Sequence, residues 1–541
     1  MIVKTGKDFD VIIISAEYYD DHPLSPAGII ARVLDSKGYT VGIIEKPETK
    51  QDFLRLRSPR LCFCVVTGSM DSMVHNFTPL KKERIKDAHS RISRIPNRAL
   101  LFYCNKIKQY HKGSIIIIGG IEASLRRFAH YDFWDNNLRR SILLDSRADI
   151  LVYGNGEIQL IEIMHRLRQG KELLGINGTC IVSKTHDDSF IDLPSFELVK
   201  ENKKKFCEMQ RLCSNDVNLA QEYTNNYVLQ FSYPPYSSKD LDWVYSLSFS
   251  RKMHPSSHLK MAQFSVVTHR GCIGACHFCA LSLHQGSRII SRSEESILSE
   301  ITNLTKHPKF KGYIDDLGGP SANMYRMECK KKHRDCNNDC IHCAYLDTSH
   351  IHLINLLKKA RSIPGVKKVF VRSGIRFDLA FKNPFYLQEL SKYHISGGLK
   401  IAPEHCSHSV LEAMNKDNNV LDTFINLFHQ FNESKRQYLQ YYFMIGHPGE
   451  SPNETKQLVQ MIKKKKLENV HQFQLFTPTP MTVSTCMYWT GYNPFTMDKI
   501  FCVHDYHTKK IMKKLMLVTI LEKNKKGKKA SGNKQNDIMS M

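Results

Sequence analysis

The chain has 541 residues, of which 42% are hydrophobic and 10% aromatic, so it can form two or three domains that each bury a core. Apolar runs such as 115–118 are far too short to span a bilayer, which excludes a transmembrane helix and a membrane partner. The formal net charge of +24 raises the question of nucleic-acid binding.

The compartment follows from the first residues and the cysteines. Residues 1–10 contain neither an apolar h-region nor a cleavage site, so we expect a cytoplasmic protein. In a reducing cytosol the 16 cysteines stay reduced, and clustered cysteines are then interpreted as metal ligands.

Residues 1–195 are predicted to form an α/β domain. Short apolar runs alternate with helical stretches as in βαβ units, which predicts an open parallel, Rossmann-like sheet. The predicted strands are 10–15, 41–44, 61–66, 114–118 and 150–153. Glycines at 119–120 and 154–156 follow two of these strands, where such a sheet places its ligand-side loops.

A half-match to a cofactor motif follows the first strand. Asp20, His22 and Ser25 have the spacing of the Asp-x-His-x-x-Gly signature of cobalamin domains, in which the histidine binds cobalt, but the final glycine is absent. The domain is thus cobalamin-domain-like, although a turn with a solvated histidine is the favoured interpretation and cobalamin binding stays undecided.

The next segments are a connector at 196–258 and a second α/β region at 259–500. The connector is polar and contains a Pro-Pro pair at 234–235, so we expect it to be irregular. Six predicted strands separated by amphipathic stretches then favour a partial (β/α)6 barrel. They are 263–268, 312–317, 368–372, 398–402, 441–445 and 472–476.

Ten lysines and two acidic residues lie between Lys509 and Met541. This basic tail at 501–541 is expected to be disordered. The remaining charge is not accompanied by an aromatic-interleaved basic module, so nucleic-acid binding is not favoured.

Three cysteines follow the first strand of the second region. Cys272, Cys276 and Cys279 form a C-x3-C-x2-C triplet, and no fourth cysteine occurs within the next forty residues. Three thiolates around a [4Fe–4S] cluster leave one iron open to an outside molecule, which favours a catalytic cluster. A structural zinc site and three unrelated buried cysteines are the alternatives.

Polar and glycine-rich motifs follow other predicted strands at the same barrel edge. Gly318 and Gly319 would let a ligand's amino group approach the backbone. Glu404 follows the fourth strand and could reach ribose hydroxyls, and the turn that ends at Glu450 follows the fifth.

These motifs, together with segments such as 119–127 and 476–481, resemble the radical S-adenosylmethionine (SAM) superfamily and, within it, the YgiQ-type family of uncharacterised proteins. The resemblance extends over about residues 8–500. It implies a radical SAM core barrel with a [4Fe–4S] cluster held by the three cysteines. Phe278, the aromatic residue before the last cysteine, matches the position that packs beside the cluster in such families.

The resemblance also implies a reaction. SAM would chelate the open iron, and an electron from a low-potential donor such as flavodoxin or ferredoxin would cleave it to methionine and a 5′-deoxyadenosyl radical. Gly318 and Gly319 would meet the amino end of SAM, and Glu404 or Glu450 the adenosine end. Ser291 and Arg292, beyond the cysteine loop, could pair with its carboxylate. The substrate and the oligomeric state are not predictable. An iron–sulfur or zinc nucleic-acid-binding protein, or radical SAM modification of RNA, remains an alternative.

A second cysteine group follows the glycine pair. Its last three members, Cys336, Cys340 and Cys343, repeat the C-x3-C-x2-C spacing, and Cys329 could supply a fourth ligand. Four thiols would close the coordination sphere, which favours a zinc site or an auxiliary cluster, with unligated thiols as the alternative.

Overall fold

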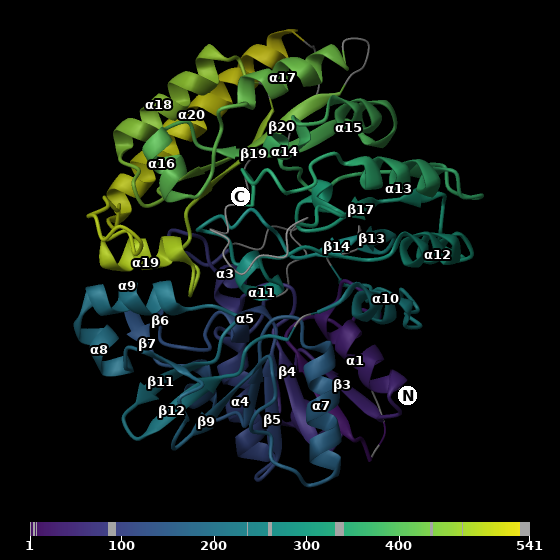
Figure 1. Cartoon of the computed structure of the whole chain (residues 1–541), viewed down its shortest axis with the longest axis vertical. Coiled ribbons are helices and arrows are strands. Elements are labelled where there is room, and N and C mark those ends of the chain that lie inside the picture. Colours follow the sequence, from purple (N-terminus) through teal and green to yellow (C-terminus); the bar gives the residue numbers. More distant parts are fainter. Residues whose placement is uncertain are drawn as a thin grey trace. The chain divides into compact units, whose positions relative to one another are not determined.

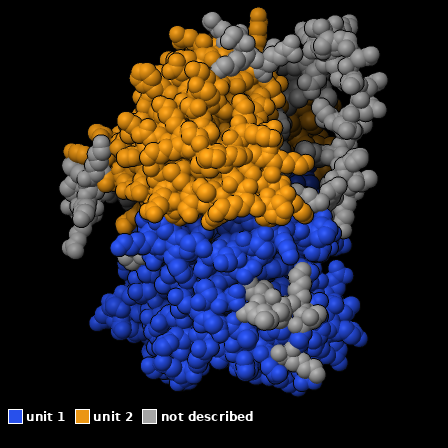
Figure 2. Space-filling model, turned by 90° about the vertical axis from the view of Figure 1, so that its right-hand side faces the viewer, with its two compact units in different colours: residues 1–263, 279–286, 478–498 blue, residues 264–278, 287–477, 499–541 orange. Residues whose placement is uncertain are grey.

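A computed structural model describes the chain except for residues 1, 4–5, 7, 85–93, 235, 258–261, 330–339, 433–436, 468 and 531–541 (Figure 1). The chain divides into two compact units (Figure 2). The first comprises Met1–Gln263, Cys279–Gly286 and Pro478–Asp498, and the second comprises Phe264–Phe278, Ser287–Thr477 and Lys499–Met541. No helix in the described part of the chain is long and apolar enough to cross a membrane.

The first unit is built on a ten-stranded sheet of order β1-β3-β2-β4-β5-β8-β9-β12-β11-β10. The strands are β1 (Ile2–Val3), β2 (Val11–Ser15), β3 (Val41–Glu45), β4 (Cys62–Val66), β5 (Ile115–Gly119), β8 (Ile150–Val152), β9 (Thr179–Ser183), β10 (Ile191–Leu193), β11 (Leu219–Tyr223) and β12 (Asn226–Gln230). In the sheet order, the strands β1, β3, β2, β4, β5 and β8 are parallel to one another. The strands β8, β9, β12 and β11 then pair antiparallel in succession. The sheet is therefore mixed, and its parallel half matches the prediction.

The parallel half has the doubly wound strand order. Without the short β1, its strands run second, first, third, fourth, fifth in chain order. Each strand is buried on both faces, which explains why their sequences are continuous apolar runs. The carboxyl ends of β5 and β8 carry the predicted glycine loops, since β5 ends at Gly119 and Gly154 follows β8 by two residues.

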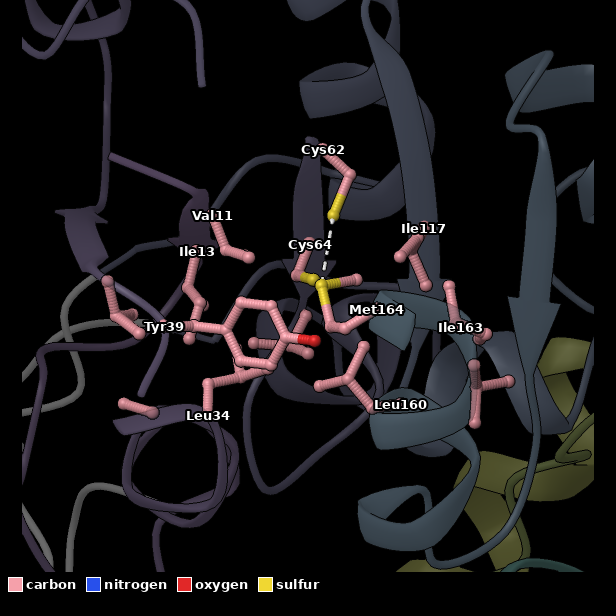
Figure 3. Close-up of a cluster of buried hydrophobic side chains, with 14 of the residues drawn as sticks. Val11, Ile13, Leu34, Tyr39, Cys62, Cys64, Ile117, Leu160, Ile163 and Met164 are labelled. Atoms are coloured by element: carbon pink, nitrogen blue, oxygen red, sulfur yellow. Dashed lines mark hydrogen bonds between the residues drawn. The ribbon is translucent and has the colours of Figure 1, made fainter. Parts of the chain in front are cut away.

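Helices cover both faces of this sheet. On one face, α1 (Pro26–Ser36) and α7 (Glu157–Arg168) pack against alternate strand residues such as Val11, Ile13 and Ile117 (Figure 3). The other face carries α4 (Ala99–Tyr110), which contacts α2 (Lys50–Leu54) and α6 (Ile142–Ser146). The period-2 alternation of strand side chains divides the core into these two layers.

The described residues of 196–258, which exclude 235 and 258, form regular helices and strands where an irregular connector was expected. The segment contains α8 (Phe196–Glu201), α9 (Lys203–Leu212), β11, β12 and α10 (Ser238–Ser246), and its two strands extend the sheet. Helix α9 packs against α19 (Val483–Thr490), so the first unit includes residues far beyond 195. Its remaining elements are α3 (Ser72–Asn76), α5 (Ile121–Ser124), β6 (His130–Asp132), β7 (Asn137–Arg139) and α11 (Leu281–Gln285).

The second unit contains strands at all six predicted places. They are β13 (Ser265–Val267), β16 (Tyr313–Ile314) with β17 (Asp316–Gly318), β18 (Lys368–Val369), β19 (Gly398–Glu404), β20 (Tyr438–Ile445) and β21 (Val470–Leu475). The pairs β13–β17, β16–β18, β19–β20 and β20–β21 are all parallel, and a parallel bridge joins Ile375 to Ile401. The short antiparallel pair is β14 (His269–Arg270) with β15 (Ile290–Ser291). These pairings support an α/β unit, and the partial barrel itself stays a prediction.

Helices accompany these strands. They are η2 (Ala322–Met324), α12 (Glu294–Thr305), α13 (Ile351–Arg361), α14 (Phe377–Ala380), α15 (Pro384–Glu389), η3 (Leu390–His394), α16 (His408–Ala413), α17 (Leu421–Gln430), α18 (Pro452–Lys464) and α20 (Tyr506–Ala530). Helix α20 occupies much of the stretch expected to be a disordered tail. It packs on α18 and buries Met512 and Met516, so apolar residues between the lysines stabilise it.

Candidate functional site

The cysteine loop begins directly after β14. Cys272 and Cys276 lie in the second unit, and both are half-buried. The Sγ atom of Cys272 lies 4.0 Å from the Ser321 hydroxyl, and burial raises the pKa of its thiol. Gly274 between them must be small, because a Cβ there would come within 2.6 Å of Arg376 Nη1.

Arg376 is the residue that motif analysis did not single out as part of this site. Its Nη1 donates to Cys276 Sγ at 3.5 Å, and its Nε and Nη2 donate to Asp378. Burial opposes ionisation of Asp378, but the adjacent guanidinium outweighs it and lowers the pKa of the carboxyl group. The contact places a buried, positively charged hydrogen-bond donor beside a sulfur of the predicted ligand loop.

Cys279 falls in the segment 279–286, which belongs to the first unit. The helix that follows, α11, is held there by two hydrogen bonds. His284 Nδ1 lies 2.9 Å from Ser124 Oγ, and Asn215 donates to the carbonyl oxygen of Leu283 at 3.1 Å. These two bonds anchor the helix that begins two residues after Cys279.

Within the described residues, no three His, Cys, Asp or Glu side chains are grouped so that they could hold a metal ion. The assignment of Cys272, Cys276 and Cys279 as ligands therefore stays a prediction. Their chemistry fits an iron–sulfur cluster, since three thiols occur within eight residues and one receives a hydrogen bond from a buried arginine.

The glycine pair lies at the end of β17. The carbonyl oxygen of Gly318 accepts from the Thr268 amide at 2.8 Å, so Gly318 is part of the β13–β17 ladder. Gly319 faces the imidazole of His269, where an added Cβ would lie 2.5 Å from Cε1. His269 is fully buried, which lowers its pKa to about 4 and keeps it neutral.

Glu404 ends β19 with a positive φ of 66°. Burial raises the pKa of its carboxyl group, although Lys416 Nζ lies 3.5 Å away and opposes the shift. Lys416 also donates to the carbonyl oxygen of Ala402 at 2.6 Å, which fixes the ammonium beside Glu404. A carboxylate at a strand end with one cation beside it can still accept from a ligand hydroxyl.

Glu450 is engaged inside the protein. Its fully buried carboxylate accepts from the Gly446 amide and the Thr455 hydroxyl, both at 2.5 Å, and lies 3.3 Å from His405 Nε2. These contacts hold the turn after β20 together. Nothing in this geometry supports a direct contact of Glu450 with adenosine, so that role stays a prediction.

The same turn provides ring surfaces. His447 is fully buried, and its ring lies between those of Phe278 and Phe476, with centroid distances of 6.2 and 5.1 Å. Desolvation lowers the pKa of His447 to about 3, so this ring is neutral. Phe278 therefore packs against the turn after β20, and its place beside a cluster stays a prediction.

Arg292 does not serve the predicted carboxylate. It is fully buried and donates to Glu300, to the carbonyl oxygen of Val267 at 2.9 Å and to Ser296. These bonds tie β13 to α12 and saturate the guanidinium. Ser291 accepts from the Arg326 amide at 2.9 Å and is likewise buried.

The second cysteine group is described only in part, since Cys336 lies outside the described residues. Cys329 is exposed and forms an antiparallel bridge with Leu346. Cys340 and Cys343 are half-buried against a cluster that includes Ile341. The second metal site stays a prediction.

His22, in the partial cobalamin signature, is buried rather than solvated. Its Nδ1 accepts from the Leu24 amide at 3.1 Å, and its Nε2 lies 3.1 Å from the carbonyl oxygen of Gln263. Desolvation lowers its pKa to about 3. Ser25 caps α1 by accepting from the Gly28 amide at 3.2 Å. Both ring nitrogens are used, so His22 as placed does not fit a cobalt ligand.

Comparison with known proteins identifies the family of this chain. The family model described as Radical SAM N-terminal matches residues 1–268, and a domain of unknown function, DUF3362, matches residues 471–519. A UPF0313 protein of Clostridium botulinum is 42% identical over 548 residues, covering 95% of this chain and 85% of the relative. The chain belongs to the UPF0313 family. The radical SAM resemblance drawn from the sequence is thereby confirmed.

A second relative and a solved structure are also similar to this chain. A UPF0313 protein of Methanocaldococcus jannaschii is 42% identical over 544 residues, covering 94% of this chain and 90% of the relative. The radical SAM methyltransferase TsrM from Kitasatospora setae has a TM-score of 0.52 at 14% identity, with 88% of this chain and 76% of that chain covered. This likeness shows the fold, and the α/β class predicted from the sequence is confirmed.

Proposed function

We propose that this UPF0313 protein is a radical SAM enzyme that binds a [4Fe–4S] cluster through Cys272, Cys276 and Cys279 and cleaves SAM reductively to form a 5′-deoxyadenosyl radical. The observation that carries the proposal is the contact of a buried arginine, Arg376, with Cys276 in the predicted ligand loop. When bound, the cluster would supply the electron for the cleavage. A low-potential flavodoxin or ferredoxin would reduce it.

The protein's own residues orient the ligand. Gly318 and Gly319 would meet the amino end of SAM at the end of β17, and Glu404 can accept hydrogen bonds from ribose hydroxyls at the end of β19. Phe278 and His447 offer ring surfaces beside the turn after β20. These groups lie at the carboxyl ends of parallel strands, where α/β enzymes place their sites.

The test is anaerobic purification followed by reduction with dithionite in the presence of SAM. We expect methionine and 5′-deoxyadenosine to form, and iron content to fall by about four atoms per chain in Cys272→Ala. Cys213→Ala, which removes a half-buried cysteine of the first unit, is the matched control and should keep its iron.

Two results would contradict the proposal. If the iron of Cys272→Ala equals that of the wild type, the ligand assignment is wrong. If neither product forms while the cluster is intact, the enzyme assignment fails, and binding of tRNA or DNA by the holoprotein becomes the function to measure.

A further inference from the structure

His269 has a buried nitrogen without a partner. Its ring is fully buried, and its Nε2 makes no hydrogen bond of ordinary distance and angle to any described residue. A backbone group of Ser321 lies near the ring and acts on its pKa, but it does not complete such a bond to Nε2. On the other side of the ring, Nδ1 lies 2.8 Å from the hydroxyl of Thr268, which is also fully buried. Buried polar atoms are rarely left unpaired in proteins, so the exception calls for an explanation.

The proton on this ring can be assigned from its neighbour. The Thr268 hydroxyl lies within hydrogen-bond distance of Nδ1, and we assign the hydroxyl as the donor of this bond. A neutral imidazole that accepts at Nδ1 carries its proton on Nε2. The unpartnered atom is then a hydrogen-bond donor, and it suits an acceptor such as a carboxylate oxygen.

The backbone beside the ring is shaped around it. A Cβ on Gly319 would lie 2.5 Å from Cε1 and 2.6 Å from Nε2, so no larger residue fits while the ring keeps its place. The φ of Gly319 does not require glycine, since Gly319 is absent from the positive-φ residues. The next residue, Pro320, has no amide hydrogen to offer a ligand. Close approach to His269 thus explains the second glycine.

His269 is also close to the cysteine loop along the chain. It lies three residues before Cys272, and Cys272 Sγ lies 4.0 Å from Ser321, two residues after Gly319. The strand end that carries Gly319 and the segment that carries His269 therefore both lie near the first predicted ligand. In the proposed enzyme this is where the amino-acid end of SAM would be held.

We propose that His269 is a SAM-binding residue whose Nε2–H donates a hydrogen bond to the carboxylate of the methionyl group. This assignment rests on the proposed function and adds to it a specific contact. Gly319 acts as its companion, because only glycine leaves the imidazole in place.

Two substitutions distinguish the role of Nε2 of His269 from that of Nδ1. The amide of glutamine reaches about as far as Nε2, whereas that of asparagine reaches only as far as Nδ1. We expect His269→Asn to raise the Kd for SAM about tenfold, or about 1.4 kcal/mol, and His269→Gln to raise it less than about threefold. The Kd is measured by anaerobic equilibrium dialysis of cluster-loaded protein with radiolabelled SAM, and iron content is measured on the same samples.

A matched control is His394→Gln. His394 is equally buried, but its Nδ1 lies 2.8 Å from the Val369 carbonyl oxygen and its Nε2 lies 3.4 Å from Glu389. Its replacement should leave the Kd for SAM unchanged. Equal Kd values for wild type and His269→Asn at equal iron content would overturn the assignment.

A second variant keeps the test decisive if His269→Asn does not fold. The methyl group of Gly319→Ala must displace the His269 ring, so we expect a similar loss of SAM affinity. An unchanged Kd in soluble, iron-replete Gly319→Ala would overturn the assignment. Absence of SAM binding by the iron-replete wild type would instead contradict the proposed function, and the assignment would fail with it.

Discussion

Arg376 Nη1 lies 3.5 Å from Cys276 Sγ, and the same guanidinium pairs with Asp378. We expect Arg376→Gln to lower the free energy of unfolding by about 3–5 kcal/mol, because it leaves a buried carboxylate without its counter-ion. Urea unfolding of the metal-free protein measures this loss.

The double variant Arg376→Gln with Asp378→Asn is the control for that loss. It removes the orphaned charge, so most of the stability should return. A double variant as unstable as the single one would show that the pair is not held together by charge.

The buried carboxylate of Glu450 is also expected to contribute to the free energy of unfolding. Glu450→Ala leaves the Gly446 amide and the Thr455 hydroxyl without their acceptor, and we expect a loss of about 3 kcal/mol. Glu412→Ala on α16 removes a carboxylate whose side chain is 77% exposed and should change stability by less than about 0.5 kcal/mol. Equal urea midpoints for the two variants would argue against a structural role for Glu450.

His22 makes the stability depend on pH. Its pKa is about 3 in the folded chain and about 6.5 when unfolded, so only the unfolded chain binds the proton between these values. The stabilising contribution is complete above pH 6.5 and is lost as the pH falls, by up to about 1.4 kcal/mol per pH unit. The free energy of unfolding, measured with urea between pH 7.5 and 5, should therefore change less with pH in His22→Gln than in the wild type. Replacement of the exposed His408 should leave this pH dependence as it is in the wild type.

Gly28 packs against the loop that carries His22. A Cβ at this position would lie 2.5 Å from the Asp20 carbonyl oxygen and 2.9 Å from that of His22, and backbone atoms cannot move aside easily. We expect Gly28→Ala to cost about 2 kcal/mol or more. Gly119→Ala meets its nearest atom at 3.5 Å and should be nearly neutral by thermal melting. Similar melting temperatures for the two variants would contradict this close packing.

The parallel half of the sheet was predictable because both faces of its strands are apolar. Strands β11 and β12 were not predictable in this way, because they bury the polar side chains of Gln221 and Gln230. Each glutamine is satisfied by a distant group: Gln221 accepts from the Ala129 amide at 2.8 Å, and Gln230 accepts from Arg127 at 2.7 Å. A local pattern cannot show that a polar side chain will find such a partner.

The site shows the same limit. The cysteine triplet and the glycine pair are visible as spacing, and each follows a strand where expected. The internal use of Arg292 and Glu450 depends on Glu300 and Thr455, which are brought to them by helix packing. Arg376 was not predicted as part of the cysteine site, because nothing near it in the sequence indicates its contact with Cys276.

The hairpin of β11 and β12 also protects a neighbour. Strand β9 pairs with β8 on one side and with β12 on the other. The edge strand of the sheet beyond them is β10, which has only three residues. A chain shortened at residue 195 would expose the amides and carbonyls of β9 along a whole edge, a template for pairing with another copy. The late strands thus cover an edge of the early sheet that would otherwise be open to pairing.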